Sequence, residues 1–262
     1  MPMFSDLEQL LDPDARGSKS PGLRPMLAAF GHHDTLLEIV EPLYAVANGG
    51  MFFGGLVRIL PLVGMDDDAG NTVSDTVTYW NDARGWKRWH SAFEARNVFV
   101  IANSALGDLY GVALGAHGEV ADARVVVVRT SAYEVETLEV TWPDFFARVR
   151  DDATFAAAAV DAPFARKALE SLGCPAIDEV LSWNVPPRLG GAYAVENLGL
   201  APLDVHVQFQ LRLPTWRMSL PHTMKTTISA RFVAWSATRS RCFAIDWTRV
   251  AREILRGSPS CT

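Results

Sequence analysis

Two short stretches carry residue types that bind metals, and neither has the spacing that a metal site needs. His32-His33-Asp34 places three ligand types side by side, but neighbouring side chains point apart, and no further ligands follow at the spacing of a zinc site. Asp66-Asp67-Asp68 lacks the alternating acids and distal glutamate of a calcium-binding loop. We therefore predict no metal and no cofactor. Asp34 is better explained as a helix N-cap.

Sequence motifs for nucleophilic catalysis and for nucleotide binding are also missing. No Gly-x-Ser-x-Gly elbow occurs, and Cys174 is followed by Pro175 without a histidine nearby in the sequence. Neither Gly-x-x-x-x-Gly-Lys-Ser/Thr nor Gly-x-Gly-x-x-Gly is present. A triad assembled only in space stays open. We predict no catalytic residue, and an enzyme with an unrecognised site is the least favoured function.

A cluster of tryptophans and arginines is more suggestive of protein binding. Such residues dominate the energetics of protein interfaces. The alternative is that the rings simply cover a sheet, because large aromatic side chains bury well. Together with the aspartates just before it, this stretch is the predicted contact surface: Asp66, Asp67, Asp68, Trp80, Arg84, Trp86, Arg88 and Trp89.

The charge is distributed unevenly along the chain. The net charge is −6, yet residues 213–262 hold eight basic and two acidic residues, and the first 212 hold 16 basic and 28 acidic ones. An acidic body repels nucleic acid and anionic membranes and attracts basic proteins; acidity for solubility alone is the plainer explanation. The eight basic residues are too dispersed for a nucleic-acid site.

Location follows from what the sequence lacks. No apolar run approaches the length of about 20 residues that crosses a bilayer, and Met1–Asp14 has no basic region ahead of an apolar stretch. The three cysteines, Cys174, Cys242 and Cys261, are widely spaced and odd in number, which suits a reducing compartment. We expect a cytoplasmic protein.

Periodicity predicts an α+β fold, with helices packed on a central antiparallel sheet. The core of the pattern is a meander of four strands with short connections. The expected helices are 34–48 (with Pro42 inside it), 73–81, 85–93 and 142–150, and the expected strands are 56–62, 98–102, 109–114, 125–130 and 132–140.

The remaining sequence has a different character. We expect a broken helix at 155–172, a helical turn or two at 177–183, a strand at 203–213 and an amphipathic helix at 246–256. The predicted division is a short helix and loop at 1–22, a main domain at 23–152, and an appended region of uncertain fold at 153–262.

The order of motifs in residues 34–152 resembles the SUKH superfamily, the Smi/Knr-type proteins. The resemblance rests on Tyr44–Gly50, Val57–Leu62, Val98–Ala102 with Gly107–Val112, and Trp142–Phe146. It implies an α+β fold and a role typical of bacterial members, which are immunity proteins that bind and neutralise a toxin. Other members are scaffolds, which is our alternative function. The family has no shared catalytic residue, and Gly49-Gly50 and Gly107-Asp108 are interpreted as turn residues.

Overall fold

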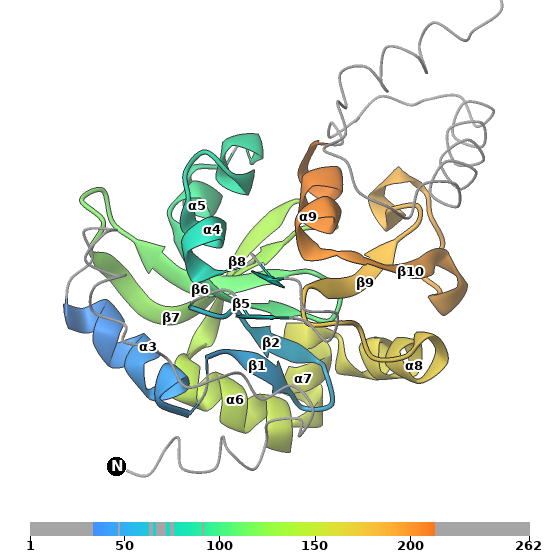
Figure 1. Ribbon diagram of the computed structural model, residues 1–262, viewed down its shortest axis with the longest axis horizontal. Coiled ribbons are helices and arrows are strands. Elements are labelled where there is room, and N and C mark those ends of the chain that lie inside the picture. Colours follow the sequence, from blue (N-terminus) through green and yellow to red (C-terminus); the bar gives the residue numbers. More distant parts are fainter. Residues whose placement is uncertain are drawn as a thin grey trace, which may run out of the picture.

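The computed structural model describes residues 34–212, except 47, 63–64, 67–71, 74–75 and 91. Its centre is a six-stranded antiparallel sheet with the strand order β1-β2-β5-β6-β7-β8 (Figure 1). This confirms the predicted α+β class and the predicted meander; kinship with the SUKH superfamily stays a prediction. The strands are β1 (Gly50–Phe52), β2 (Val57–Ile59), β5 (Val98–Ser104), β6 (Leu109–Leu114), β7 (Val120–Arg129) and β8 (Glu134–Thr141).

Helices cover both faces of the sheet. On one side lie α3 (Asp34–Val46) and α6 (Trp142–Asp151), and on the other lie α4 (Val77–Asn81) and α5 (Phe93–Arg96) (Figure 1). Because both faces are covered, all seven residues of β5 are buried. Between α4 and α5 runs the 3₁₀ helix η2 (Trp86–Trp89), and the short pair β3 (Met65–Asp66) and β4 (Thr72–Val73) precedes α4.

The segment after α6 belongs to the same hydrophobic core. Asp152 ends α6 and begins the next helix, where its carboxylate accepts the Phe155 N–H at 3.0 Å. The predicted division between 152 and 153 therefore falls between two helices that share one core. The segment contains α7 (Ala153–Val160), α8 (Ala162–Leu172), β9 (Glu179–Trp183), η3 (Pro187–Leu189), η4 (Val195–Asn197), β10 (Leu198–Pro202) and α9 (Leu203–Arg212).

Two predictions in this segment were wrong. Residues 203–213 were expected to form a strand because apolar residues alternate there, but α9 occupies 203–212. The face that α9 buries includes His206 and Gln210, both 0% exposed, and these polar residues hid the helical spacing. The stretch 177–183 was expected to be helical, yet 179–183 form β9 and pair with β10. The predicted helix at 246–256 lies outside the described residues.

Candidate functional site

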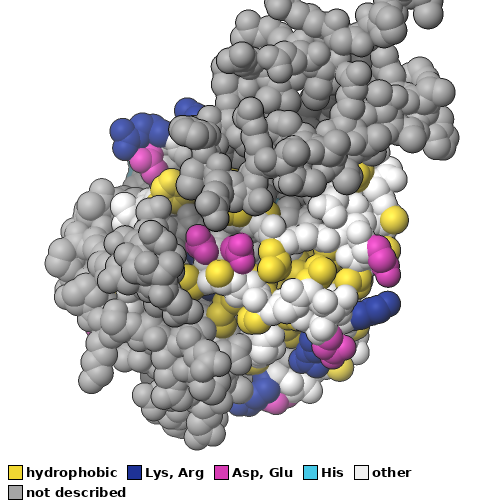
Figure 2. Space-filling view, turned by 45° about the vertical axis from the view of Figure 1, so that its right-hand side comes forward, with side chains coloured by type: hydrophobic (Ala, Val, Ile, Leu, Met, Phe, Trp, Pro, Cys, Tyr) yellow, Lys and Arg dark blue, Asp and Glu magenta, His cyan; other side chains and the backbone are white. Residues whose placement is uncertain are grey.

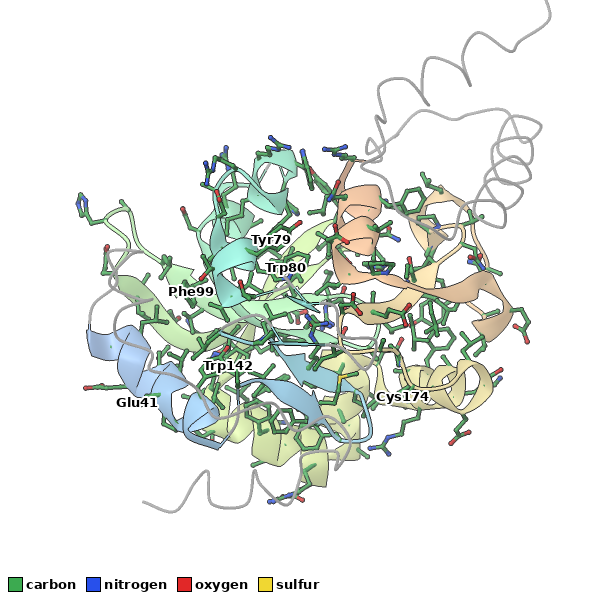
Figure 3. All side chains as sticks on the ribbon, in the orientation of Figure 1. Glu41, Tyr79, Trp80, Phe99, Trp142 and Cys174 are labelled. Carbon is green, nitrogen blue, oxygen red and sulfur yellow. The ribbon has the colours of Figure 1, made fainter. Side chains whose placement is uncertain are left out.

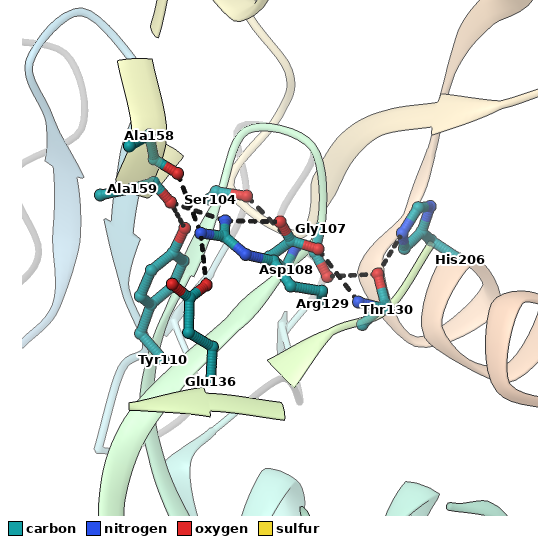
Figure 4. A network of polar contacts seen from close by, with 10 residues as sticks. All are labelled: Ser104, Gly107, Asp108, Tyr110, Arg129, Thr130, Glu136, Ala158, Ala159 and His206. Atoms are coloured by element: carbon teal, nitrogen blue, oxygen red, sulfur yellow. Dashed lines mark hydrogen bonds and ion pairs between the residues drawn. The ribbon is translucent and has the colours of Figure 1, made fainter. Parts of the chain in front are cut away.

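A buried polar network joins the turns of the meander to α7 (Figure 4). Asp108 lies between β5 and β6. Its Oδ2 forms an ion pair with Arg129 at 3.2 Å, and both side chains are largely buried. Arg129 also donates to the carbonyl oxygens of Ala159, at 2.7 Å, and Ala158, at 3.0 Å. Burial raises the pKa of Asp108, and Arg129 acts against this shift. The guanidinium thus satisfies one buried carboxylate and the end of one helix.

The network continues through Thr130 into α9. The Thr130 hydroxyl donates to the Gly107 carbonyl at 3.1 Å and lies 3.1 Å from His206 Nε2. Because a hydroxyl has a single hydrogen, Nε2 must be the donor to Thr130. His206 Nδ1 is then an acceptor, and the Ser182 hydroxyl, 2.9 Å away, donates to it. Every hydrogen-bonding group of the neutral imidazole is satisfied.

Ser182 and His206 have the atoms of a nucleophile and a base, but a substrate cannot reach the His206 ring. The side chain of His206 is 0% exposed, and burial lowers its pKa to about 3. A ring that stays neutral and sealed from solvent holds elements together rather than activating a substrate. Gly107, with φ +80°, confirms the predicted turn, and a β-carbon there would lie 2.4 Å from the His206 ring. The network is therefore a structural joint between the sheet, β9 and α9.

The predicted contact surface divides into buried and exposed members. Trp80 is 1% exposed and Trp86 is 3% exposed; Trp80 packs between α4 and the sheet (Figure 3). The Trp86 Nε1–H donates to the Trp80 carbonyl at 2.8 Å. These two rings lie beneath the surface and support it. Asp67 and Asp68 lie outside the described residues, and the backbone of Asp66 pairs with Thr72.

Exposed Arg88 and half-buried Trp89 form an arginine–tryptophan stack. The guanidinium carbon of Arg88 lies 5.0 Å from the centre of the Trp89 ring, and that of Arg212, from α9, lies 4.1 Å from it. Arg84 is exposed and forms an ion pair with Asp82 at 2.7 Å. The structure thus brings Arg88 and Trp89 together and adds Arg212, which sequence reasoning missed because it is distant along the chain.

An exposed aromatic group elsewhere on the molecule was also not predicted from the sequence. Tyr193 is 58% exposed, and its ring centroid lies 4.5 Å from that of Phe164 and 5.1 Å from that of Trp183. Asn197 fixes the loop that carries Tyr193, since its side-chain amide donates to the carbonyl oxygens of Val185, at 2.7 Å, and Ala192, at 2.8 Å. The three rings, called the aromatic triad below, come from a helix, a strand and a loop, so no local sequence motif predicts them.

The face that carries α8 shows no dominant charge. In Figure 2, hydrophobic side chains lie exposed on this face, with separate acidic and basic side chains around them. Within the described part of the chain, no three His, Cys, Asp or Glu side chains are grouped so that they could hold a metal ion. No helix among these residues is long and apolar enough to cross a membrane.

Comparison with known proteins points to an immunity family. Residues 141–213 match the family model described as "T6SS immunity protein Tdi1, C-terminal". No curated protein matches the chain. Among solved structures, "Crystal structure of Atu4351 from Agrobacterium tumefaciens" is similar, with a TM-score of 0.49 and 13% identity, over 81% of this chain and 89% of that one. The family match covers α6, a predicted helix, and α7 to α9, which lie in the region whose fold the sequence left open, and it includes the aromatic triad.

Proposed function

We propose that this protein is a cytoplasmic immunity protein that binds a toxin delivered by a type VI secretion system and blocks it by occlusion. The match of residues 141–213 to the Tdi1 immunity family is the observation that carries the proposal. The resemblance of residues 34–152 to a superfamily rich in immunity proteins supports it independently. The protein performs no chemistry of its own in this function.

Two surface features suit such a partner. The aromatic triad presents a rigid tyrosine, because Asn197 holds the loop of Tyr193 before binding, and a preorganised aromatic side chain loses little entropy when it binds. The Arg88–Trp89–Arg212 stack combines the two residue types most enriched at interface hot spots. The acidic charge of the first 212 residues would speed encounter with a basic toxin, and these anchors would slow its release.

Co-expression with the neighbouring toxin tests the function directly. The proposal predicts that a type VI effector gene lies beside the gene for this protein. That effector should arrest growth when expressed alone, and this protein should restore growth and co-purify with the effector in equal amounts. Binding without protection would favour the alternative, a scaffold or adaptor. Absence of binding to that effector would refute the proposal.

Point variants at the aromatic triad test the surface. Tyr193→Ala should weaken toxin binding at least tenfold, as expected when a hot-spot side chain worth about 1.4 kcal/mol or more is truncated. Tyr193→Phe is the matched control, because it keeps the ring and should bind like wild type. Equal binding by the alanine and phenylalanine variants would remove the triad from the interface.

The arginine–tryptophan stack and the aspartates need separate variants. Trp89→Ala should raise the dissociation rate, whereas replacing Asp66, Asp67 and Asp68 by Asn should slow association and flatten its salt dependence. Surface plasmon resonance at two salt concentrations separates these effects. Unchanged kinetics in either variant would remove that part of the predicted contact surface from the interface.

A further inference from the structure

Strand β10 leaves one edge of its sheet open. It pairs with β9 through all five of its residues, in an unbroken antiparallel register (Figure 1). No strand among the described residues pairs with its other edge. This small sheet lies within residues 141–213, the segment that matches the immunity family. An open strand edge is a template on which another chain can add a strand.

The hydrogen bonds of β9 show which backbone groups face the open edge. In an antiparallel pair, alternate residues bond to the partner strand, and the residues between them point away from it. Leu181 lies opposite Leu200, and its N–H donates to the Ala105 carbonyl at 2.8 Å, away from β10. Because the two residues of such a pair point in opposite directions, the N–H and C=O of Leu200 point to the open edge.

The ends of this edge limit what can pair with it. The N–H of Leu198 donates to the Val195 carbonyl, so that Leu198 offers only its own carbonyl. Pro202, at the start of α9, has no N–H. Leu198 and Leu200 thus offer two carbonyl acceptors and one donor. Two antiparallel copies of this edge would bond at Leu200 alone and would leave both Leu198 carbonyls unpaired, so the edge fits a segment that brings more donors.

Acidic side chains flank the same edge. Glu179 lies opposite Pro202, and the proximity of Asp178 adds to the burial that raises the pKa of Asp204. The guanidinium of Arg188 donates to carbonyl oxygens of the β7–β8 turn and of α9. Lysine or arginine side chains of a partner would be attracted here. Residues 176–205 contain one basic residue, Arg188, and four acidic ones: Asp178, Glu179, Glu196 and Asp204.

An exposed leucine and the aromatic triad share one face of this sheet. The side chain of Leu200 is 42% exposed. Trp183, a member of the triad, lies opposite Leu198, and side chains two residues apart on a strand point to the same face. Leu200 therefore lies on the face of Trp183, and alternate side chains of an added strand would lie on that face too.

We propose that the open edge of β10 binds an extended, basic segment of the toxin by strand addition. The backbone of the segment pairs with Leu200 and donates one further N–H to the Leu198 carbonyl. An apolar side chain of the segment packs on Leu200 beside the aromatic triad, and a lysine or arginine lies near the carboxylates at the Pro202 end. This inference rests on the proposed immunity function and specifies the kind of toxin segment that is bound.

Amide hydrogen exchange, followed by NMR on the full-length protein, tests the edge. In the free protein, the Leu200 amide should exchange at least tenfold faster than those of Gly199 and Ala201, which face β9. Binding of the neighbouring type VI effector should slow exchange at Leu200 at least tenfold. Slow exchange at Leu200 in the free protein, or unchanged exchange in the complex, would overturn the proposal even if the protein protects against the effector.

Variants separate the backbone from the charges. Leu200→Pro removes the outward N–H and spares the bonds to β9, since proline is tolerated where the N–H faces an open edge. It should weaken effector binding at least tenfold, and Leu200→Val, which keeps the N–H, should bind like wild type. Asp178→Asn with Glu179→Gln should slow association and flatten its salt dependence. The matched charge control is Glu41→Gln with Glu134→Gln, both exposed on other elements, which should associate like wild type.

The outcomes distinguish strand addition from the immunity function. A wild-type protein that neither binds the effector nor protects against it refutes both. Protection by the wild type together with wild-type affinity in folded Leu200→Pro refutes strand addition alone. The amide spectrum of each variant establishes that it is folded. If Leu200→Pro does not fold, exchange of the Leu200 amide in the wild type decides.

Discussion

The buried imidazole of His206 predicts a specific loss of stability in mild acid. The folded protein holds this ring neutral, with a pKa of about 3 against an ordinary value of 6.5. Between these two values the unfolded chain binds more protons than the folded one, so the free energy of unfolding falls as the pH falls below 6.5. Because the folded pKa lies far below 5, the size of the effect down to that pH depends only on the unfolded value.

The magnitude follows from linkage. Between about pH 7.5 and about pH 5, His206 alone should lower the free energy of unfolding by about 2 kcal/mol. Urea titrations at both pH values, followed by circular dichroism, measure it. His206→Gln should be less stable at pH 7.5 but should lose about 2 kcal/mol less on acidification than wild type. His117→Gln changes an exposed histidine and serves as the control.

One outcome would refute the reasoning about this joint. If wild type and His206→Gln lose the same stability between the two pH values, His206 is not held neutral by its burial. A histidine NMR titration gives an independent check, since the His206 ring signals should not move down to about pH 5. Titration of this ring near its ordinary pKa would contradict the hydrogen-bond assignment with Thr130 and Ser182.

Three further substitutions should reduce stability without touching an exposed surface, and urea titration at pH 7 measures each. Gly107→Ala should cost about 2–4 kcal/mol, because the left-handed backbone and the 2.4 Å approach to His206 both oppose a β-carbon; a change below about 0.5 kcal/mol would show that the turn relaxes freely. Asn81→Ala should cost about 2–3 kcal/mol, since it leaves both the N–H and the carbonyl of buried Val100 unpaired, and a near-neutral result would mean that water replaces the amide. Trp86→Ala should cost about 3–5 kcal/mol by opening a cavity under η2, and a folded, stable variant that loses toxin binding instead would return this ring to the interface.

The sequence predicted well where the pattern is local. Strand β6 occupies 109–114 as expected, and α6 spans 142–151 against an expected 142–150, because clear periodicity defines them. The prediction failed in α9, where a buried histidine and a buried glutamine take positions that normally carry apolar residues. The burial of His206 is possible because Thr130 and Ser182 supply its hydrogen bonds.

The candidate surfaces, too, were predictable only where their residues are close in the sequence. Arg88 and Trp89 are neighbours in the sequence, and the stack that they form was within reach of sequence reasoning. Arg212 joins them from α9, and the aromatic triad is assembled from Phe164, Trp183 and Tyr193. Such groups depend on how distant segments pack, which no short motif encodes.

The joint around His206 also has a consequence for synthesis on the ribosome. The chain grows from its N-terminus, so the meander, with Gly107 and Thr130 at its turns, is made before α9. Until α9 emerges, the Thr130 hydroxyl lacks its histidine partner and the apolar side chains that α9 covers face the solvent. Completion of the core therefore waits for the last described helix, and a nascent chain stalled before residue 203 would be a substrate for chaperones rather than a shorter working protein.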